Sequence, residues 1–203
     1  PGKERWGGWP DRYRNQLNAL RTWAAQAAAG KTDFDRKFSS TFPYFWRRGK
    51  EALILLEDGT YGRLNEKERR FRSFCHKDYT PTNVMRDGNG GIQVIDFDSC
   101  CHDLRAYDIS QLVTNSSGWE IGRAIDVLDA YDRVSPLSLE ELRLVVALLQ
   151  LPRELFWAGH LHYQRAHGDQ SALVAREIMD RILAERDRRE AFIKELTRIA
   201  SGS

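Results

Sequence analysis

The sequence predicts a mainly helical α+β domain with one small β-hairpin near its middle. Two observations favour this class. Over most of the chain, apolar residues recur three and four positions apart, which is the period of an amphipathic helix. The exception is the stretch around Asp87-Gly88-Asn89-Gly90-Gly91. Glycine and asparagine accept a positive φ at low cost, so this segment predicts a tight turn between two short strands.

Composition limits the classes of function. Apolar residues make up 41% of the 203 residues and charged residues 30%, which is typical of a soluble globular domain. The net charge of +2 is too small to indicate a nucleic-acid partner. No apolar run approaches the roughly 18 residues that would span a bilayer, and no secretory signal pattern opens the chain, so we expect no membrane association and a cytoplasmic location. Three cysteines do not form a disulfide framework and fit a reducing compartment.

The N-terminal part predicts a lead-in and a first helix. Residues 1–10 are rich in Gly and Trp and are typical of a linker or a docked extended segment. We expect Asp11 to cap a helix over 11–29 and Gly30 to end it. One face of this helix carries its apolar residues, which are Tyr13, Leu17, Leu20, Trp23, Ala24 and Ala27.

A second helix is predicted to begin near Thr32 or Asp33. Pro43 and Gly49 predict a break before residues 50–56. The stripe of phenylalanines in this region is expected to lie in the core and consists of Phe34, Phe38, Phe42 and Phe45.

The following segment, 65–72, is strongly charged, with the sequence Asn-Glu-Lys-Glu-Arg-Arg-Phe-Arg. A basic patch that faces phosphate is one interpretation. A solvated helix or loop that leads into the next strand is the other, and it is the more common origin of such a charge run.

Short strands are predicted at 73–75, Val84–Arg86 and 92–97, and helices after them. Helices are expected over 104–113, 119–132 and 170–199. Two more are expected between the last two of these ranges: one begins with a capping box formed by Ser138 and Glu141, and the next begins at Pro152. Within the last helix, residues 186–190 (Arg-Asp-Arg-Arg-Glu) are expected to lie on a solvated face.

The chemistry concentrates around the hairpin. His76 and Asp78 precede Asn83 in a loop, and Asp96 follows the turn. A hairpin brings its two ends together, so Asn83 and Asp96 should lie close in space, and their oxygens are ligands that suit Mg²⁺ bound to phosphate. Asp78 is then placed to accept a hydroxyl proton, as in phosphoryl transfer. Asp98 is either a further metal ligand or a surface residue.

The spacing H-x-D-x-x-x-x-N followed by I-D-F-D resembles the aminoglycoside and choline phosphotransferase branch of the kinase-like superfamily. The flanking segments F-C-H-K-D-Y-T-P-T-N-V and L-P-R-E-L-F-W resemble its spore-coat kinase-like family of the coat protein S type. This resemblance implies Mg²⁺ and ATP as ligands, Asp78 as catalytic base, and Asn83 and Asp96 as metal ligands. It also implies that His76 shapes the loop and that Asp108 braces it.

The resemblance implies a kinase-like C-terminal lobe over 11–203, with a catalytic loop (76–83), a metal-binding hairpin (84–98) and a helical subdomain (104–199). We expect no nucleotide-clamping N-terminal lobe in this chain, because the residues before His76 indicate helices. None of Lys31, Lys37 and Lys50 stands in the strand context that a nucleotide lysine requires. Alone, the chain is expected to transfer phosphate poorly or not at all.

Three functions stay open: a phosphotransferase acting on a small hydroxyl- or amine-bearing acceptor, a catalytically silent structural or interaction protein of the spore coat, and a fragment of a choline, homoserine or aminoglycoside kinase. The implied partners are the acceptor or spore-coat proteins, or a second copy bound at the face that an N-terminal lobe would cover. The implied location extends to the spore coat. Weaker candidates for contacting the acceptor are Glu154, Trp157, His160 and Tyr163.

A cluster of cysteines and histidines raises the alternative of a zinc site. Its members are Cys75, His76, Cys100, Cys101 and His102. Adjacent cysteines rarely both reach one tetrahedral ion, and the C-x₂-C spacing is missing, so small buried thiols are the favoured interpretation.

Overall fold

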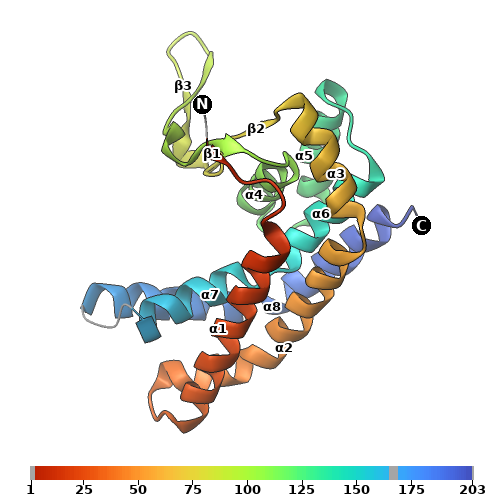
Figure 1. Cartoon of the computed structure of the whole chain (residues 1–203). Helices are drawn as coiled ribbons and strands as arrows, with labels where there is room; N and C mark the ends of the chain where they lie inside the picture. The colour runs from red at the N-terminus through yellow and green to blue at the C-terminus, as the bar shows by residue number, and fades with distance from the viewer. Residues whose placement is uncertain (1–2, 165–168, 203) are drawn as a thin grey trace.

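The computed structural model describes residues 3–164 and 169–202 and shows a mainly helical fold with small β elements. Three long helices form its frame: α1 (Trp9–Ala29), α2 (Asp33–Glu57) and α8 (Asp169–Ala200). α2 packs against both α1 and α8 (Figure 1). The predicted α+β class is confirmed.

Four of the shorter helices, α3 to α6, gather at one end of this frame, and α7 lies apart from them (Figure 1). α6 packs against α2, α4 and α8, and α7 lies along α8 and α1. The shorter helices are α3 (Thr60–Phe71), α4 (Ala106–Ser117), α5 (Ile121–Val134), α6 (Leu139–Gln150) and α7 (Arg153–Gly159), which continues as the π-helical turn η3 (His160–Gln164).

The β structure consists of two small sheets. In one, β5 (Cys101–His102) lies between β1 (Lys3–Glu4), which runs parallel to it, and β2 (Phe74–Cys75), which runs antiparallel. The other is the predicted hairpin of β3 (Val84–Arg86) and β4 (Ile92–Val94). Within the predicted lead-in, Lys3–Glu4 is therefore docked and extended, in agreement with the second of the two interpretations, whereas Trp9 and Pro10 belong to α1.

The first helix begins earlier than predicted. Its N-cap is Gly8, and Asp11 lies in its first turn, so the prediction of Asp11 as the cap was wrong. Pro10 occupies one of the first helical positions, where a missing N–H leaves no helical hydrogen bond unmade. Burial of Trp9, which is 2% exposed, adds a further reason for the helix to start there.

The predicted break in the second helix is absent, because α2 continues through Pro43 and Gly49. A Cβ atom at Gly49 would lie 2.5 Å from Cδ2 of Leu17, so this glycine permits the close approach of α1 and α2 rather than ending a helix. Burial of Phe34, Phe38 and Phe45 on one face stabilises α2 by more than the single hydrogen bond that a proline removes.

Other boundaries agree with the sequence or differ for local reasons. The charged segment 65–72 falls at the end of α3, in agreement with the solvated-helix interpretation. β4 ends at Val94, and a 3₁₀ turn, η2 (Phe97–Ser99), follows Asp96, so the strand is shorter than the predicted 92–97. The predicted capping box at Ser138 with Glu141 forms, and a second capping box, at Thr32 with Asp35, begins α2 where the start of a helix was predicted. In the part of the chain that the structure describes, no helix is long and apolar enough to cross a membrane.

Candidate active site

The loop of residues 76–83 connects β2 to the hairpin, and Asp108 anchors its first turn. Asp108 lies in the first turn of α4 and accepts hydrogen bonds from the backbone N–H groups of His76 (2.6 Å) and Lys77 (3.0 Å). Lys77 has φ +68°, a left-handed conformation that turns the chain sharply between His76 and Asp78. Burial raises the pKa of Asp108, and the two N–H donors act in the opposite direction.

Asp78 and Asn83 are joined directly. The Nδ2 atom of Asn83 donates to the backbone carbonyl of Asp78 at 2.9 Å and to its Oδ2 at 3.1 Å. Asn83 is buried and ends the 3₁₀ turn η1 (Pro81–Asn83), while Asp78 is half-buried. The amide therefore orients the Asp78 carboxylate and leaves the Asn83 Oδ1 atom as an oxygen available to a cation.

The hairpin register brings Asn83 and Asp96 to the same end of the hairpin. Val84 pairs with Val94, and the N–H of Ile95 donates to the carbonyl of Asn83 at 3.0 Å, which places the following Asp96 beside it. Asp96 has φ +63° and an exposed side chain. One amide and one carboxylate oxygen fit Mg²⁺, which keeps water or phosphate oxygens in its remaining positions. Asp98 is exposed within η2, two residues farther along.

His76 links the loop to the hairpin. Its Nδ1 accepts from the backbone N–H of Asp78 at 3.3 Å, so its Nε2 carries the proton and donates to the carbonyl of Ile95 at 2.9 Å. Its ring lies edge-on to Phe97, with centroids 4.9 Å apart. These contacts suit a residue that positions Asp78 rather than one that exchanges protons.

Lys77 points into the interior, which sequence reasoning did not predict. Its Nζ lies 2.5 Å from Oδ2 of Asp103 and 3.6 Å from the centroid of the Tyr107 ring. Trp9 donates from Nε1 to the same Asp103 oxygen at 3.0 Å. Both charged side chains are at most 5% exposed. Trp9 at the start of α1, the loop of residues 76–83 and the start of α4 therefore meet at one buried ion pair.

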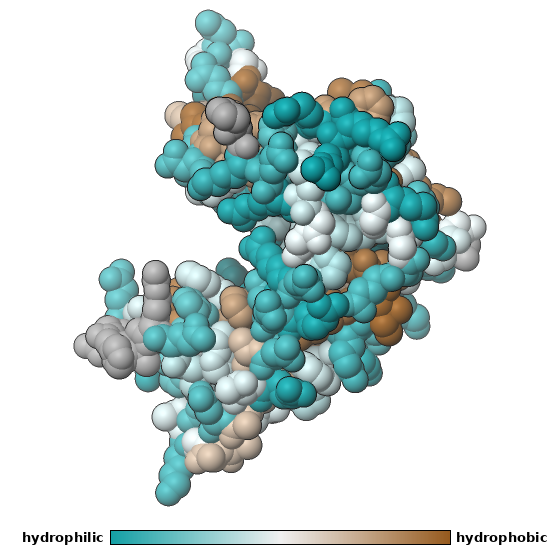
Figure 2. All heavy atoms as spheres, in the orientation of Figure 1, coloured by the Kyte–Doolittle hydropathy of each residue, from teal (hydrophilic) through white to brown (hydrophobic). Residues whose placement is uncertain are grey.

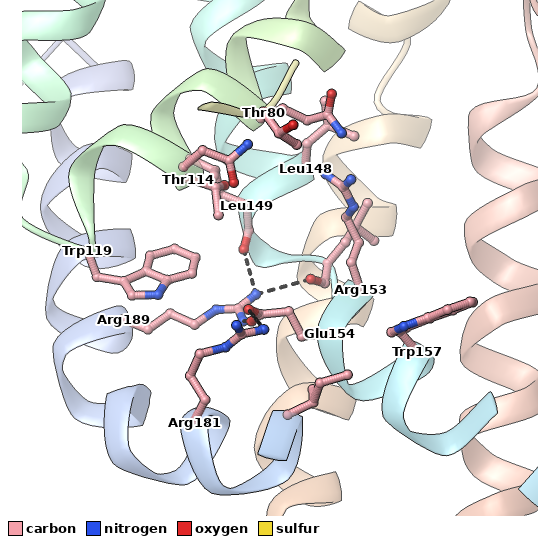
Figure 3. A pocket seen from close by; sticks show the side chains of 14 residues that line it. Thr80, Thr114, Trp119, Leu148, Leu149, Arg153, Glu154, Trp157, Arg181 and Arg189 are labelled. Carbon is pink, nitrogen blue, oxygen red and sulfur yellow. Dashed lines mark hydrogen bonds and ion pairs between the residues drawn. The ribbon is translucent and has the colours of Figure 1, made fainter. Parts of the chain in front are cut away.

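A cavity of about 310 Å³ opens beside the loop. Thr80, two residues after Asp78, lines it together with residues of α4, α6, α7 and α8. Figure 2 shows the molecule hollowed between the part that carries the hairpin and the ends of the helices below it. Glu154 and Trp157, two of the four predicted acceptor contacts, line this cavity (Figure 3).

The other two predicted acceptor contacts do not line the cavity. Tyr163 donates from its hydroxyl to Oδ1 of Asp35 at 2.8 Å and packs against Phe38, so it belongs to the core. His160 bonds Gln164 at 2.7 Å and stacks on Trp157 outside the cavity lining.

Three arginines in the cavity were missed by sequence reasoning: Arg153, Arg181 and Arg189. Arg189 is 5% exposed, which corrects the expectation that residues 186–190 lie on a solvated face. Burial lowers its pKa, and Glu154 opposes that effect. Its position eight residues after Arg181 on one helix was the available signal, since that spacing keeps both near one face.

The cysteines are used in packing. Cys75 and Cys101 are buried opposite each other in the β2–β5 pair, and burial raises the pKa of both thiols. His102 contacts the carbonyl of Arg72 through Nδ1 at 2.9 Å. Within residues 3–164 and 169–202, no three His, Cys, Asp or Glu side chains are grouped so that they could hold a metal ion.

Comparison with known proteins places this geometry in a family. The model of the family described as "Spore coat putative kinase YutH" matches residues 2–196. Spore coat protein S of Bacillus subtilis (strain 168) is 24% identical over 199 residues, which are 96% of this chain and 56% of that protein. Homoserine kinase of Methylobacillus flagellatus is 31% identical over 136 residues, which are 58% of this chain and 42% of that protein.

A solved structure agrees with the fold. The aminoglycoside phosphotransferase from Alicyclobacillus acidocaldarius superposes with a TM-score of 0.86 at 24% identity, over 96% of this chain and 59% of that one. The predicted kinase-like fold is thereby confirmed. The chain spans about half the length of the proteins it matches.

Proposed function

The chain belongs to the spore coat YutH family of kinase-like proteins, and from this premise we propose that it is the acceptor-binding and catalytic lobe of a phosphotransferase that uses Mg·ATP. The observation that carries the proposal is the Asp78 carboxylate, which Asn83 holds at 3.1 Å two residues from a cavity-lining threonine. A base held beside an acceptor cavity is what transfer to a hydroxyl requires.

The residues divide into distinct roles. Asp78 would accept the proton of the acceptor hydroxyl while that oxygen bonds to the γ-phosphorus of ATP and the bond from this phosphorus to ADP breaks, so that ADP leaves. Asn83 and Asp96 would hold Mg²⁺, which supplies charge neutralisation to the phosphate oxygens when it is bound. His76 and Asp108 keep the loop in shape through the backbone contacts described above. The acceptor is a small molecule with a hydroxyl or amine.

Activity is proposed for this chain joined to a nucleotide-covering lobe, called the longer protein below, since the matched relatives extend well beyond the region of similarity. Apolar side chains lie exposed at and near the hairpin, where brown atoms gather in Figure 2. We assign this face to a nucleotide-covering lobe, which positions the triphosphate. The exposed apolar residues are Phe71, Phe74, Met85, Ile92, Ile95 and Phe97.

A test compares phosphoryl transfer from Mg·ATP by the longer protein and its Asp78→Asn variant. We expect kcat to fall by about 10²–10⁴, the usual contribution of a general base, with the KM for ATP little changed. Asp126→Asn is the matched control, because Asp126 is an exposed carboxylate on α5. Undiminished turnover in Asp78→Asn would rule out the assigned base.

A second candidate is a catalytically silent protein that assembles in the spore coat. The observation that favours it is the similarity to a spore coat protein over 96% of the chain. Calorimetric titration of the longer protein with Mg·ATP separates the two. Binding that Asp96→Ala abolishes supports the phosphotransferase, whereas no binding to the wild type supports the silent protein. For the 203-residue chain alone we expect weak or no binding.

A further inference from the structure

The cavity beside the catalytic loop is strongly cationic. Arg153, Arg181 and Arg189 line it, and Glu154 is the single acidic side chain in its lining. Within the lining, three guanidinium groups face one carboxylate, and Glu185, outside the lining, accepts a hydrogen bond from Nε1 of the lining residue Trp119 at 3.0 Å. Glu154 contacts Arg189 at 2.9 Å and Arg181 at 3.5 Å, so its negative charge is already shared. An ammonium-bearing acceptor would meet repulsion here, and an acidic acceptor would meet attraction.

Arg189 is held as a built part of this cavity. Its Nη2 donates to the backbone carbonyls of Leu149 (2.9 Å) and Leu151 (3.1 Å), and its guanidinium lies 4.7 Å from the centroid of the Trp119 ring. Figure 3 shows Arg189 and Arg181 converging beside Glu154. Backbone carbonyls fix the group in one orientation, which lowers the entropic cost of using it to bind a ligand.

The Nε–H of Arg189 is buried and has no hydrogen-bond partner in the described part of the chain. A buried donor on a charged group that lacks an acceptor is costly, so Arg189 keeps its charge beside the cavity in spite of that cost. Arg153 lines the same cavity, and its guanidinium donates to the neutral hydroxyl of Tyr107 at 3.2 Å. The Arg181 side chain is 56% exposed at the cavity, so it has room to change its rotamer and contact a ligand.

We propose that this cavity selects an acidic acceptor: a small polyhydroxy compound with a carboxylate. The carboxylate binds at Arg181, where the buried charge of Arg189 also attracts it, and a hydroxyl at the other end lies near Thr80. Guanidinium groups bind planar carboxylates through paired, charge-assisted hydrogen bonds. A volume of about 310 Å³ limits the acceptor to a small molecule. The proposal rests on the proposed function, since it names the acceptor class of the same site.

The test titrates the 203-residue chain, without nucleotide, with three compounds of similar size and different charge: D-gluconate, D-glucosamine and sorbitol. We expect gluconate to bind at least about tenfold more tightly than the other two, because one charge-assisted hydrogen bond contributes enough for that difference. Isothermal titration calorimetry gives each Kd. Tighter binding of glucosamine or sorbitol, or no binding of gluconate, overturns the proposal.

Two variants locate the binding. Arg181→Gln is expected to weaken gluconate binding by about tenfold or more, and it should fold because this side chain is 56% exposed. Arg176→Gln is the control, since Arg176 is exposed on the same helix and outside the cavity lining. Equal affinities in the two variants contradict the assigned cavity.

A third variant separates this proposal from the proposed function. Asp78→Asn should retain gluconate binding, because the anionic group binds at the arginines, and in the longer protein it should lose phosphoryl transfer. If the longer protein transfers phosphate to an amine-bearing acceptor and gluconate does not bind, the proposed phosphotransferase function holds and only the proposal of an acidic acceptor is rejected.

Discussion

Lys77 illustrates how one side chain fixes the loop of residues 76–83 to the interior. Its ammonium forms a buried ion pair with Asp103, beneath Trp9 and Tyr107. Its two neighbours in the sequence, His76 and Asp78, both belong to the candidate site. Because the Lys77 backbone is in the left-handed region and its N–H is bound by Asp108, the loop is held by side chain and main chain together.

Lys77→Met tests this link. The substitution keeps most of the apolar stem but leaves Asp103 buried without its cation, so the free energy of unfolding should fall by about 3–5 kcal/mol. Urea denaturation measures the change. The control is Arg70→Met, because Arg70 and Glu66 form a pair at 3.4 Å with both side chains largely exposed. That change should cost less than about 1 kcal/mol. Equal decreases in the free energy of unfolding in the two variants would contradict a larger contribution from the buried pair than from the exposed pair.

Asp108 gives a pH-dependent prediction. Burial raises its pKa in the folded protein above the ordinary 3.8. The folded state therefore holds the proton more tightly than the unfolded state, and the resulting stability is full below pH 3.8 and is lost as the pH rises through the folded-state pKa. Asp108→Asn removes this titration. The stability of the wild type relative to the variant should thus decrease from acidic to neutral pH in urea denaturation. A relative stability that rises with pH would contradict the raised pKa.

Gly159 shows why glycine occurs where two helices approach each other closely. At Gly159, the last residue of α7, an added Cβ atom would lie 2.5 Å from Cε3 of Trp23 and 3.1 Å from Cε2 of Phe38. Those rings belong to the buried cluster under α1 and α2 and have little room to move. Helix packing, rather than chain reversal, explains this glycine as it does Gly49.

Gly159→Ala should therefore destabilise the fold by about 1–3 kcal/mol, because overpacking against two buried rings outweighs the better helix propensity of alanine. The matched control is Gly62→Ala in α3, where an added Cβ meets nothing within 4 Å. There the lower entropy of the unfolded chain should stabilise the protein by about 0.4–1 kcal/mol. Thermal and urea denaturation of both variants measure the difference, and changes of the same sign would refute the packing argument.

In the whole molecule, two hydrophobic clusters share the same long helices. α1 contributes Tyr13 to one cluster and Leu20 to the other. α8 likewise contributes Phe192 to the first and Met179 to the second. Neither cluster can lose its packing without freeing helices that the other needs. The cavity with the arginines opens beside this shared frame, so its walls depend on both clusters.

We expect one cooperative unfolding transition as a consequence. Tryptophan fluorescence and far-UV circular dichroism in urea should give the same midpoint. Leu148→Ala and Leu20→Ala, one in each cluster, should both lower that single midpoint, since removing a buried leucine costs about 2–5 kcal/mol. Two separate transitions, each sensitive to only one variant, would show that the clusters unfold independently.

Local signals in the sequence predicted much of this fold. The capping box at Ser138, the helix start near Thr32 and the turn at residues 87–91 depend on interactions within a few residues, so they can be predicted without knowledge of distant neighbours. The break predicted at Pro43 was wrong because burial of distant side chains overrode a local preference. The catalytic-loop spacing predicted that Asn83 and Asp96 would meet, since a hairpin fixes its own register.

The sequence by itself determined the helical class, the hairpin, the family and the residues that gather around Asp78. Only the tertiary structure decided where the long side chains point. Lys77 forms a buried ion pair with Asp103, and Arg189 is buried although its segment was predicted to be solvated. Tyr163 was predicted to contact the acceptor but bonds Asp35 in the core. The physical reason is the separation along the chain of the residues that interact. Caps and turns depend on neighbours in the chain, whereas the direction and partner of a charged side chain depend on residues far away in sequence.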